Sequence, residues 1–114
     1  MVQMTMQVPN ELAKRLQPIR YWLPIILELS LVGFKTPAAE TAAEIIRFLS
    51  KNPSPQEVFN HQVSKRAQDR LRRLLILNEA SLLGEIEQLE MDELQQIEHI
   101  MIMLKAHVAE QLQQ

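Results

Sequence analysis

The chain has no cysteine and only two glycines among its 114 residues. The lack of cysteine excludes disulfides, thiolate metal ligands and cysteine nucleophiles, and it is consistent with a reducing cytoplasm. Two glycines are too few for a loop that cradles phosphate. Aromatic residues are also scarce, with one Trp, one Tyr and three Phe. We therefore expect a core of aliphatic side chains and methionine, as is common in helical bundles.

Long apolar runs and a strong charge imbalance are missing as well. The longest apolar stretch, Leu23 to Phe34, includes Glu28 and Ser30 and is shorter than the roughly 20 residues that cross a bilayer. The chain opens on alternating apolar and polar residues instead of the apolar block of a signal peptide, so we expect a cytoplasmic protein. Its net charge of −2 argues against a generally basic nucleic-acid binder.

Catalytic and metal-binding patterns are not evident in the sequence. His99 and His107 would lie about two turns apart on one helix, too far to chelate one ion, and His61 is remote from both in the sequence. Ser54 and Ser64 are better explained as helix caps than as nucleophiles, because no Gly-x-Ser-x-Gly motif surrounds them. We therefore predict a protein that is not an enzyme and that needs no metal or cofactor.

Residues 2–8 alternate strictly between apolar and polar side chains, which predicts a short strand ended by Pro9. Its apolar face would carry Val2, Met4, Met6 and Val8, and its polar face Gln3, Thr5 and Gln7. A lone strand in a helical chain leaves its backbone N–H and C=O groups without partners. Antiparallel pairing with a second copy would satisfy them, so the strand predicts a homodimer. The alternative is a frayed N-terminus.

The remaining sequence predicts a mainly all-α fold of five to six short helices that ends in a helical hairpin. The expected helix caps are Asn10, Ser54 with Glu57 as a capping box, and Ser64, and Gly33 is the expected stop of the second helix. The expected helices cover residues 11–17, 24–32, 38–49, a short stretch after Ser54, 64–78 and 85–112.

The two helices of the expected hairpin carry opposite charges. The first has a basic patch of Lys65, Arg66, Arg70, Arg72 and Arg73, and the second begins with an acidic stretch. The patch could bind phosphates or an acidic partner, or it could face the acidic stretch, each pair contributing about 0–1 kcal/mol. We favour the second interpretation. The last helix has an apolar seam of Leu94, Ile97, Met101, Leu104, Val108 and Leu112.

The first 34 residues resemble the ribbon-helix-helix fold, on the strand of residues 2–8 and the junction Val8-Pro9-Asn10-Glu11-Leu12. In that fold, paired strands enter the DNA major groove and read bases, which by position implies base reading by Gln3, Thr5 and Gln7. Two departures weigh against DNA binding. Pro24 removes a phosphate-binding N–H group, and the segment has a net charge of only +1 from Lys14, Arg15, Arg20, Glu11 and Glu28.

The stretch from Arg70 to Lys105 resembles the C-terminal part of a family of small uncharacterised bacterial proteins that are antitoxin-like. The similarity lies in Leu71-Arg-Arg-Leu-Leu-Ile-Leu-Asn78, the acidic helix after it and the Ile97-Glu-His99 to Leu104-Lys-Ala106 ending. Leu82-Leu83-Gly84 replaces the threonine-proline expected after the turn. The resemblance implies a protein partner, such as a nuclease-type toxin. It also implies a recognition helix with Ile97, Glu98, His99, Met101, Met103 and Lys105.

We therefore expect one compact domain. A ribbon-helix-helix-like segment would cover residues 1–34, and a helical segment with the C-terminal hairpin would cover residues 35–114. The predicted function is a non-catalytic, antitoxin-like interaction or regulatory module that binds a partner protein and, as a further option, DNA. The alternative is a structural scaffold or assembly factor with no nucleic-acid role. The apolar run Ile100 to Leu104 has its own alternatives, which are a partner-binding surface or burial on both sides within the bundle.

Overall fold

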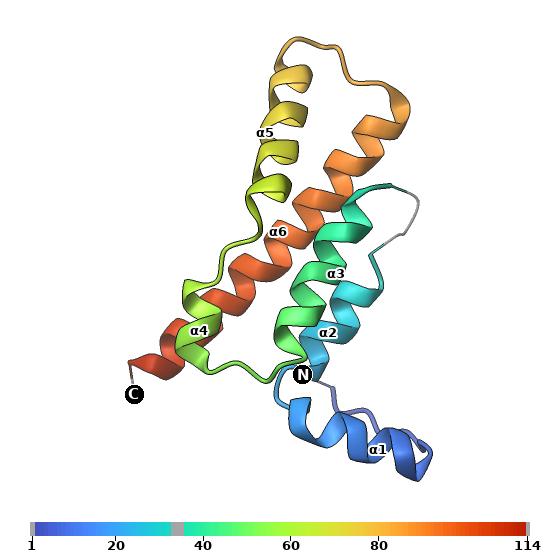
Figure 1. Ribbon diagram of the computed structural model, residues 1–114, viewed down its shortest axis with the longest axis vertical. Helices are drawn as coiled ribbons and strands as arrows, with labels where there is room; N and C mark the ends of the chain where they lie inside the picture. The colour runs from blue at the N-terminus through green and yellow to red at the C-terminus, as the bar shows by residue number, and fades with distance from the viewer. Residues whose placement is uncertain (1, 33–35, 114) are drawn as a thin grey trace.

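The computed structural model describes residues 2–32 and 36–113, and it is mainly helical, as the sequence predicts (Figure 1). A 28-residue helix at the C-terminal end is central, and shorter helices pack along it. In chain order the helical elements are α1 (Asn10–Leu16), the 3₁₀ turn η1 (Gln17–Ile19), α2 (Leu23–Ser30), α3 (Ala38–Leu49), α4 (Pro55–Asn60), α5 (Lys65–Glu79) and α6 (Glu85–Leu112).

The core lies where α2, α3 and α4 pack against α6, and α5 packs against the first part of α6. α6 contributes a stripe of apolar residues spaced three and four apart, the spacing that keeps side chains on one face of a helix. The predicted seam is confirmed from Leu94 to Val108, whereas Leu112 is exposed. The core residues include Leu29, Ala42, Ile45, Leu49, Val58, Leu74, Met91, Leu94, Ile97, Ile100, Met101, Leu104 and Val108.

The helix starts in the middle of the chain follow the predicted caps. The Ser54 hydroxyl accepts a hydrogen bond from the N–H of Glu57, whose carboxylate accepts one from the N–H of Ser54, both at 3.2 Å. The Ser64 hydroxyl accepts from the N–H of Ala67 at 3.2 Å and caps α5. These bonds satisfy N–H groups that the first turn of a helix otherwise leaves free. Local sequence therefore sets the starts of α4 and α5.

The start of α1 differs from the prediction. Asn10 is the first residue of α1 and not its cap, and no side chain caps this helix. Pro9 precedes it with φ at −58°, and its carbonyl oxygen accepts the N–H of Ala13 at 3.0 Å. Proline suits this position because its φ is already close to the helical value. α2 begins at Leu23 and ends at Ser30, and the predicted stop at Gly33 lies outside the described residues.

Trp22 joins the N-terminal third of the chain to the rest. Its side chain is 2% exposed, and its indole Nε1–H donates to the carbonyl oxygen of Pro53 at 3.0 Å. Its ring meets that of Tyr21 edge to face, with centroids 4.5 Å apart. The Tyr21 hydroxyl donates to the side chain of Gln111 near the end of α6. These contacts pack the residues before α2 onto the α3–α4 turn and onto α6.

The N-terminal strand that the sequence predicts is not seen in the described chain. Residues 2–9 form no strand, and residues 2–8 make no backbone hydrogen bond to another described residue. The reason is that a strand needs a neighbouring strand for its backbone groups, and residues 2–32 and 36–113 contain none. The backbone of residues 2–8 is therefore left without a hydrogen-bond partner among the described residues. We name residues 2–9 the N-terminal arm.

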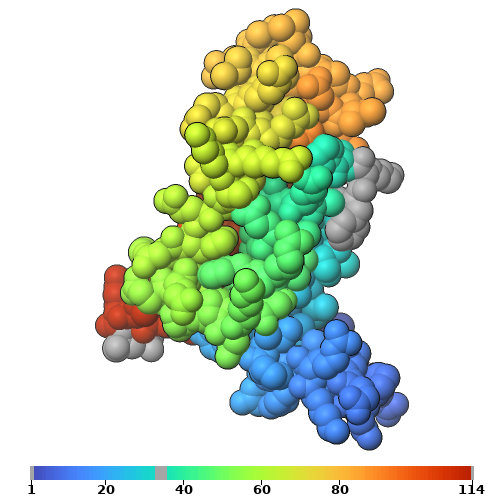
Figure 2. Space-filling model, viewed as in Figure 1, coloured from blue at the N-terminus to red at the C-terminus, as the bar shows by residue number. Residues whose placement is uncertain are grey.

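The arm and α1 lie at the end of the molecule opposite the α5–α6 turn, and α1 projects from the helical body (Figure 2). α1 buries none of its side chains.

Among the described helices, none is both long enough and apolar enough to cross a membrane.

Candidate interaction site

The N-terminal arm exposes its apolar side chains to water. Val2, Met4 and Met6 are 87%, 82% and 67% exposed, and only Val8 is half-buried. The predicted base-reading residues Gln3, Thr5 and Gln7 are exposed as well. A group of exposed apolar side chains close together in the chain is typical of a binding surface. The arm is therefore a candidate interface.

The predicted recognition residues of α6 are divided between the core and the surface. Ile97 and Met101 are buried in the core, while Glu98, His99 and Met103 are exposed. The sixth, Lys105, is half-buried, and its ammonium group donates to the carbonyl oxygen of His61. A partner reaches only the outer side of α6, so these six residues do not form one contact surface.

The apolar run of α6 follows neither of its two alternatives completely. Ile100, Met101 and Leu104 are buried, whereas Ile102 and Met103 are 57% and 58% exposed. The helix therefore packs on one side and leaves two apolar side chains in water on the other.

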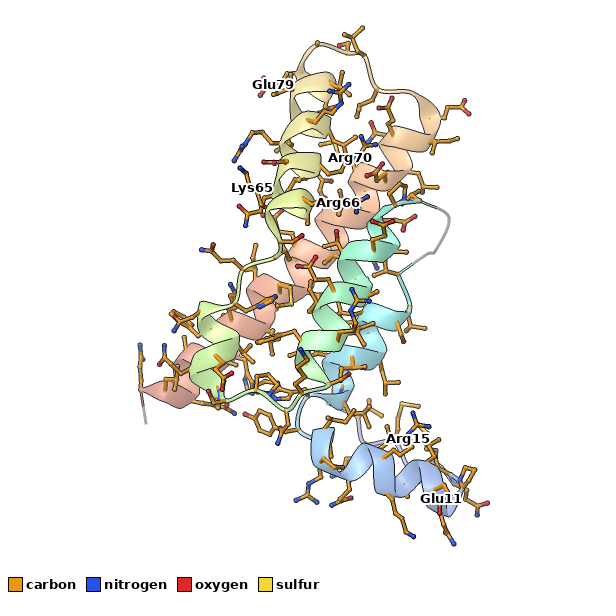
Figure 3. All side chains as sticks on the ribbon, viewed as in Figure 1. Glu11, Arg15, Lys65, Arg66, Arg70 and Glu79 are labelled. Carbon is orange, nitrogen blue, oxygen red and sulfur yellow. The ribbon has the colours of Figure 1, made fainter. Side chains whose placement is uncertain are left out.

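A groove of about 700 Å³ lies between α3, α5 and α6. Arg66 and Arg70 of the predicted basic patch point from α5 toward α3 and α6, and Lys65 points away from them (Figure 3). The groove lining has as many carboxylates as guanidinium groups, so it offers no net charge to an anion. Its charged residues are Arg47, Arg66, Arg70, Arg73, Glu40, Glu44, Asp69 and Glu90.

Arg70 and Glu90 form the closest ion pair of the groove. Arg70 Nε lies 2.8 Å from Glu90 Oε2, and Arg70 Nη2 lies 2.7 Å from Glu90 Oε1. The Glu90 side chain is 2% exposed and that of Arg70 is 38% exposed. Hydrogen bonding to Glu90 raises the pKa of Arg70 above its ordinary value. The pair joins α5 to α6, as the interpretation of charge pairing within the hairpin predicts.

The rest of the basic patch does not follow that interpretation. Arg66 lies 3.9 Å from Glu40 of α3, and Arg72 lies 3.5 Å from Asp69, one turn earlier on α5. Lys65 and Arg73 make no ion pair with another described residue. Pairing with the acidic start of α6 is therefore limited to Arg70.

The N-terminal end of α5 already binds a carboxylate of the same chain. Glu44 of α3 accepts the Ser64 N–H at 2.6 Å and the Ser64 hydroxyl at 3.0 Å. A helix N-terminus is the natural position for a phosphate or another anion. Because Glu44 accepts both of these hydrogen bonds, the Ser64 N–H and hydroxyl are not available to a phosphate.

His61 follows α4 and lies against α3. Its ring stacks on that of Phe48, with centroids 4.0 Å apart and planes inclined by 12°. Its Nε2 is buried and has no hydrogen-bond partner among the described residues. Burial, and then the positive charge of Lys105, lower the pKa of His61 below its ordinary value of 6.5, and the opposing effect of Glu44 is smaller. The fold therefore favours the neutral imidazole.

This environment of His61 predicts a stability that decreases on acidification. The pKa of His61 is higher in the unfolded chain than in the folded chain, so the unfolded chain binds the proton more readily. The stabilising contribution is therefore fully present above about pH 6.5 and is lost as the pH falls below it toward the folded pKa. The free energy of unfolding is measured by denaturant unfolding between about pH 7.5 and pH 5, at steps of about half a pH unit.

The control for this prediction is His61→Phe, which keeps a ring against Phe48 and removes the titrating group. We expect a shallower decrease of stability with falling pH in this variant than in the unsubstituted chain. An identical pH dependence in both proteins would show that His61 is not the group responsible.

No three His, Asp or Glu side chains in the described part of the chain are placed to share a metal ion. The hydroxyl oxygens of Ser54 and Ser64 accept hydrogen bonds from helix N–H groups. Their positions are explained by capping, which is a structural role.

The sequence interpretation missed a further exposed apolar surface, at the end of the α5–α6 hairpin. We name residues 75–89 the hairpin tip. Five apolar side chains there are 40% to 70% exposed, and they are Leu75, Ile76, Leu82, Ile86 and Leu89. The signal that could have indicated it is the seam of α6, whose spacing extends back from Leu94 through Glu90 to Ile86.

Comparison of the chain with protein-family models, curated proteins and solved structures found no match.

Proposed function

We propose that the protein is a non-catalytic interaction module that forms a homodimer through its N-terminal arms and binds a partner protein. The observation that carries the proposal is the arm itself. Val2, Met4 and Met6 are exposed, and the backbone of residues 2–8 has no hydrogen-bond partner among the described residues. Contact with a second copy would bury the apolar side chains and would also give the backbone its hydrogen-bond partners.

Antiparallel pairing of two arms is favoured by the alternation of residues 2–8. In a paired strand, every second side chain lies on one face, so Met4 and Met6 of both copies would be buried together between the ribbon and the helices. Burial of one such side chain contributes about 1.5–3 kcal/mol. Burial of four methionines, two from each copy, would offset part of the several kcal/mol that association costs. Gln3, Thr5 and Gln7 would remain on the outer face.

The partner class follows from the resemblance of the last two helices to antitoxin-like proteins. In that interpretation the module binds a partner protein, for which a nuclease-type toxin is the leading candidate. The exposed residues Glu98, His99 and Met103 of α6 remain available for such a contact.

Two matched sets of substitutions in the arm test the dimer. Met4→Lys with Met6→Lys places charges on the face that pairing would bury, and we expect a monomer. Gln3→Ala, Thr5→Ala and Gln7→Ala alter only the opposite face, and we expect the dimer to persist. Molar mass by light scattering separates the two outcomes. A dimer that survives the lysine substitutions would exclude the arm as the pairing element.

Sequence-specific DNA binding is a second candidate, favoured by the exposure of Gln3, Thr5 and Gln7. Glutamine can bond adenine in two places in the major groove. Phosphate contacts would come from few basic residues, so the affinity would be modest. The triple alanine variant tests this role too. If the arm reads bases, the variant loses sequence preference and keeps its salt-dependent binding to any DNA. An unchanged preference would exclude base reading.

A further inference from the structure

The hairpin tip continues the core-facing stripe of α6 beyond the end of the core. From Glu90 to Val108 every residue on this stripe is buried, but Ile86, one turn before Glu90, is 70% exposed. The difference arises because neither α2 nor α3 extends as far as the first turn of α6. The tip therefore projects beyond both helices (Figures 1 and 2). A stripe that faces the core elsewhere therefore faces solvent at the tip.

α5 alone does not cover this part of the stripe. Leu75 and Ile76 of α5, Leu82 of the turn, and Ile86 and Leu89 of α6 are all exposed within this end of the hairpin. Two helices cannot bury all of each other's apolar surface, and a third helix normally completes such a layer. Several exposed apolar side chains at one end of a hairpin are typical of a protein-binding site.

The charge of the tip indicates which partner fits. Residues 75–89 contain Glu79, Glu85 and Glu87 and no lysine, arginine or histidine. None of these three glutamates makes an ion pair with a described residue. Contact between the tips of two copies would bring the glutamates of both together, and like charges at close range oppose association. A second copy of this chain is therefore a poor occupant, and a basic one is favoured.

We propose that the hairpin tip docks a basic amphipathic helix of a partner protein. The apolar face of that helix would cover Leu75, Leu82 and Ile86, completing the helical layer, and its lysine or arginine residues would face Glu79, Glu85 and Glu87. This is the helix-in-groove mode of recognition, in which apolar anchors supply affinity and flanking charges supply orientation. The proposal rests on the protein's being a binding module, and it adds a docking surface at the end opposite the arm.

The test uses the full chain and a synthetic amphipathic helix of leucine and lysine, about 14 residues or 20 Å long. Fluorescence anisotropy of the labelled peptide measures its affinity. We expect binding that weakens with salt, and no binding of an analogue in which glutamate replaces lysine. A scrambled peptide of the same composition, whose leucines no longer share a face, should bind weakly.

Matched variants locate the contact. Leu82→Gln with Ile86→Gln should weaken binding by about tenfold or more, since these residues are central to the surface. Phe59→Gln with Leu112→Gln changes apolar side chains that are exposed on α4 and at the end of α6, both 43%, and should leave affinity unchanged. Glu79→Gln, Glu85→Gln and Glu87→Gln together should flatten the salt dependence, and glutamine still accepts the Gly84 N–H that Glu87 accepts at 3.2 Å.

Three results would overturn the proposal. They are failure of the lysine peptide to bind, equal loss of affinity in the tip variant and in the Phe59 and Leu112 control, and conversion of a dimer to a monomer by the tip substitutions. The last would show that the tip contacts a second copy. Arm variants that lose the dimer and keep peptide binding would contradict the proposed dimer without affecting this inference. Circular dichroism confirms that each variant is folded.

Discussion

Replacement of Arg70 by methionine is expected to lower the free energy of unfolding by about 3 kcal/mol. The substitution leaves the Glu90 carboxylate without the two hydrogen bonds of 2.7 and 2.8 Å that it receives from the guanidinium group. Glu90 remains almost fully buried, so water replaces those bonds poorly. Arg70 is itself partly exposed, which places the expected effect at the lower end for a broken buried pair. Denaturant unfolding of the variant measures it.

A double variant and a surface variant serve as controls for the Arg70 prediction. Arg70→Met combined with Glu90→Leu removes both charges and fills a similar volume, and its stability should return to within about 1 kcal/mol of the unsubstituted chain. Arg66→Met breaks only the exposed pair with Glu40 and should cost less than about 1 kcal/mol. If Arg70→Met proved as mild as Arg66→Met, the pair would not bind α5 to α6 in the way that its geometry implies.

Replacement of Trp22 by alanine is expected to cost about 4 kcal/mol of stability. The change removes the largest side chain of the core and creates a cavity where the start of α2 meets the α3–α4 turn. It also leaves the buried carbonyl oxygen of Pro53 without the indole N–H that lies 3.0 Å from it. Because this residue joins the N-terminal third of the chain to the remainder, loss of α2 packing should accompany the decrease. The decrease is measured by denaturant unfolding.

Trp22→Phe separates the two contributions of the indole. It keeps most of the ring packing and removes the hydrogen bond, and we expect a cost of about 1–2 kcal/mol. Tyr21→Phe removes only the exposed hydroxyl bond to Gln111 and should cost less than about 1 kcal/mol. Equal stability of Trp22→Ala and Tyr21→Phe would contradict the role of Trp22 as the anchor.

The features that sequence predicts well are local ones. The capping box of Ser54 and Glu57, the Ser64 cap and the start of α6 depend on residues within one helical turn. Asn10 is the exception, because Pro9 already starts α1 without a side-chain cap. Helix periodicity likewise indicates the buried face of α6 correctly, from Leu94 to Val108.

The features that sequence predicts poorly depend on where other elements end. Ile86 and Val108 lie on the same stripe of α6, yet one is 70% exposed and the other is fully buried. The positions of α2, α3 and α4 along α6 decide between them. The charge pattern of the hairpin had the same limit. It indicates that α5 and α6 attract one another, but not that Arg70 is the residue of the basic patch that reaches a carboxylate of α6. It also gives no sign that Glu44 of α3 accepts a hydrogen bond from Ser64 at the start of α5.

The N-terminal arm would form a strand only with a partner outside the chain, because the described residues offer no strand to pair with. The alternation of residues 2–8 is a correct description of the sequence, but a strand forms only where another strand pairs with it. The single copy leaves Met4 and Met6 in water. The central claim, that these residues join two copies, is thus a question of oligomeric state.

The most direct test is the molar mass, by light scattering, of the full chain and of a chain that lacks residues 2–8. The account predicts a dimer for the full chain and a monomer for the truncated one, with equal helix content by circular dichroism because residues 2–8 belong to no helix. Two monomers would contradict the pairing of the arms. Two dimers would move the interface to the helices, with the exposed apolar residues of α2 and α6 as the next candidates.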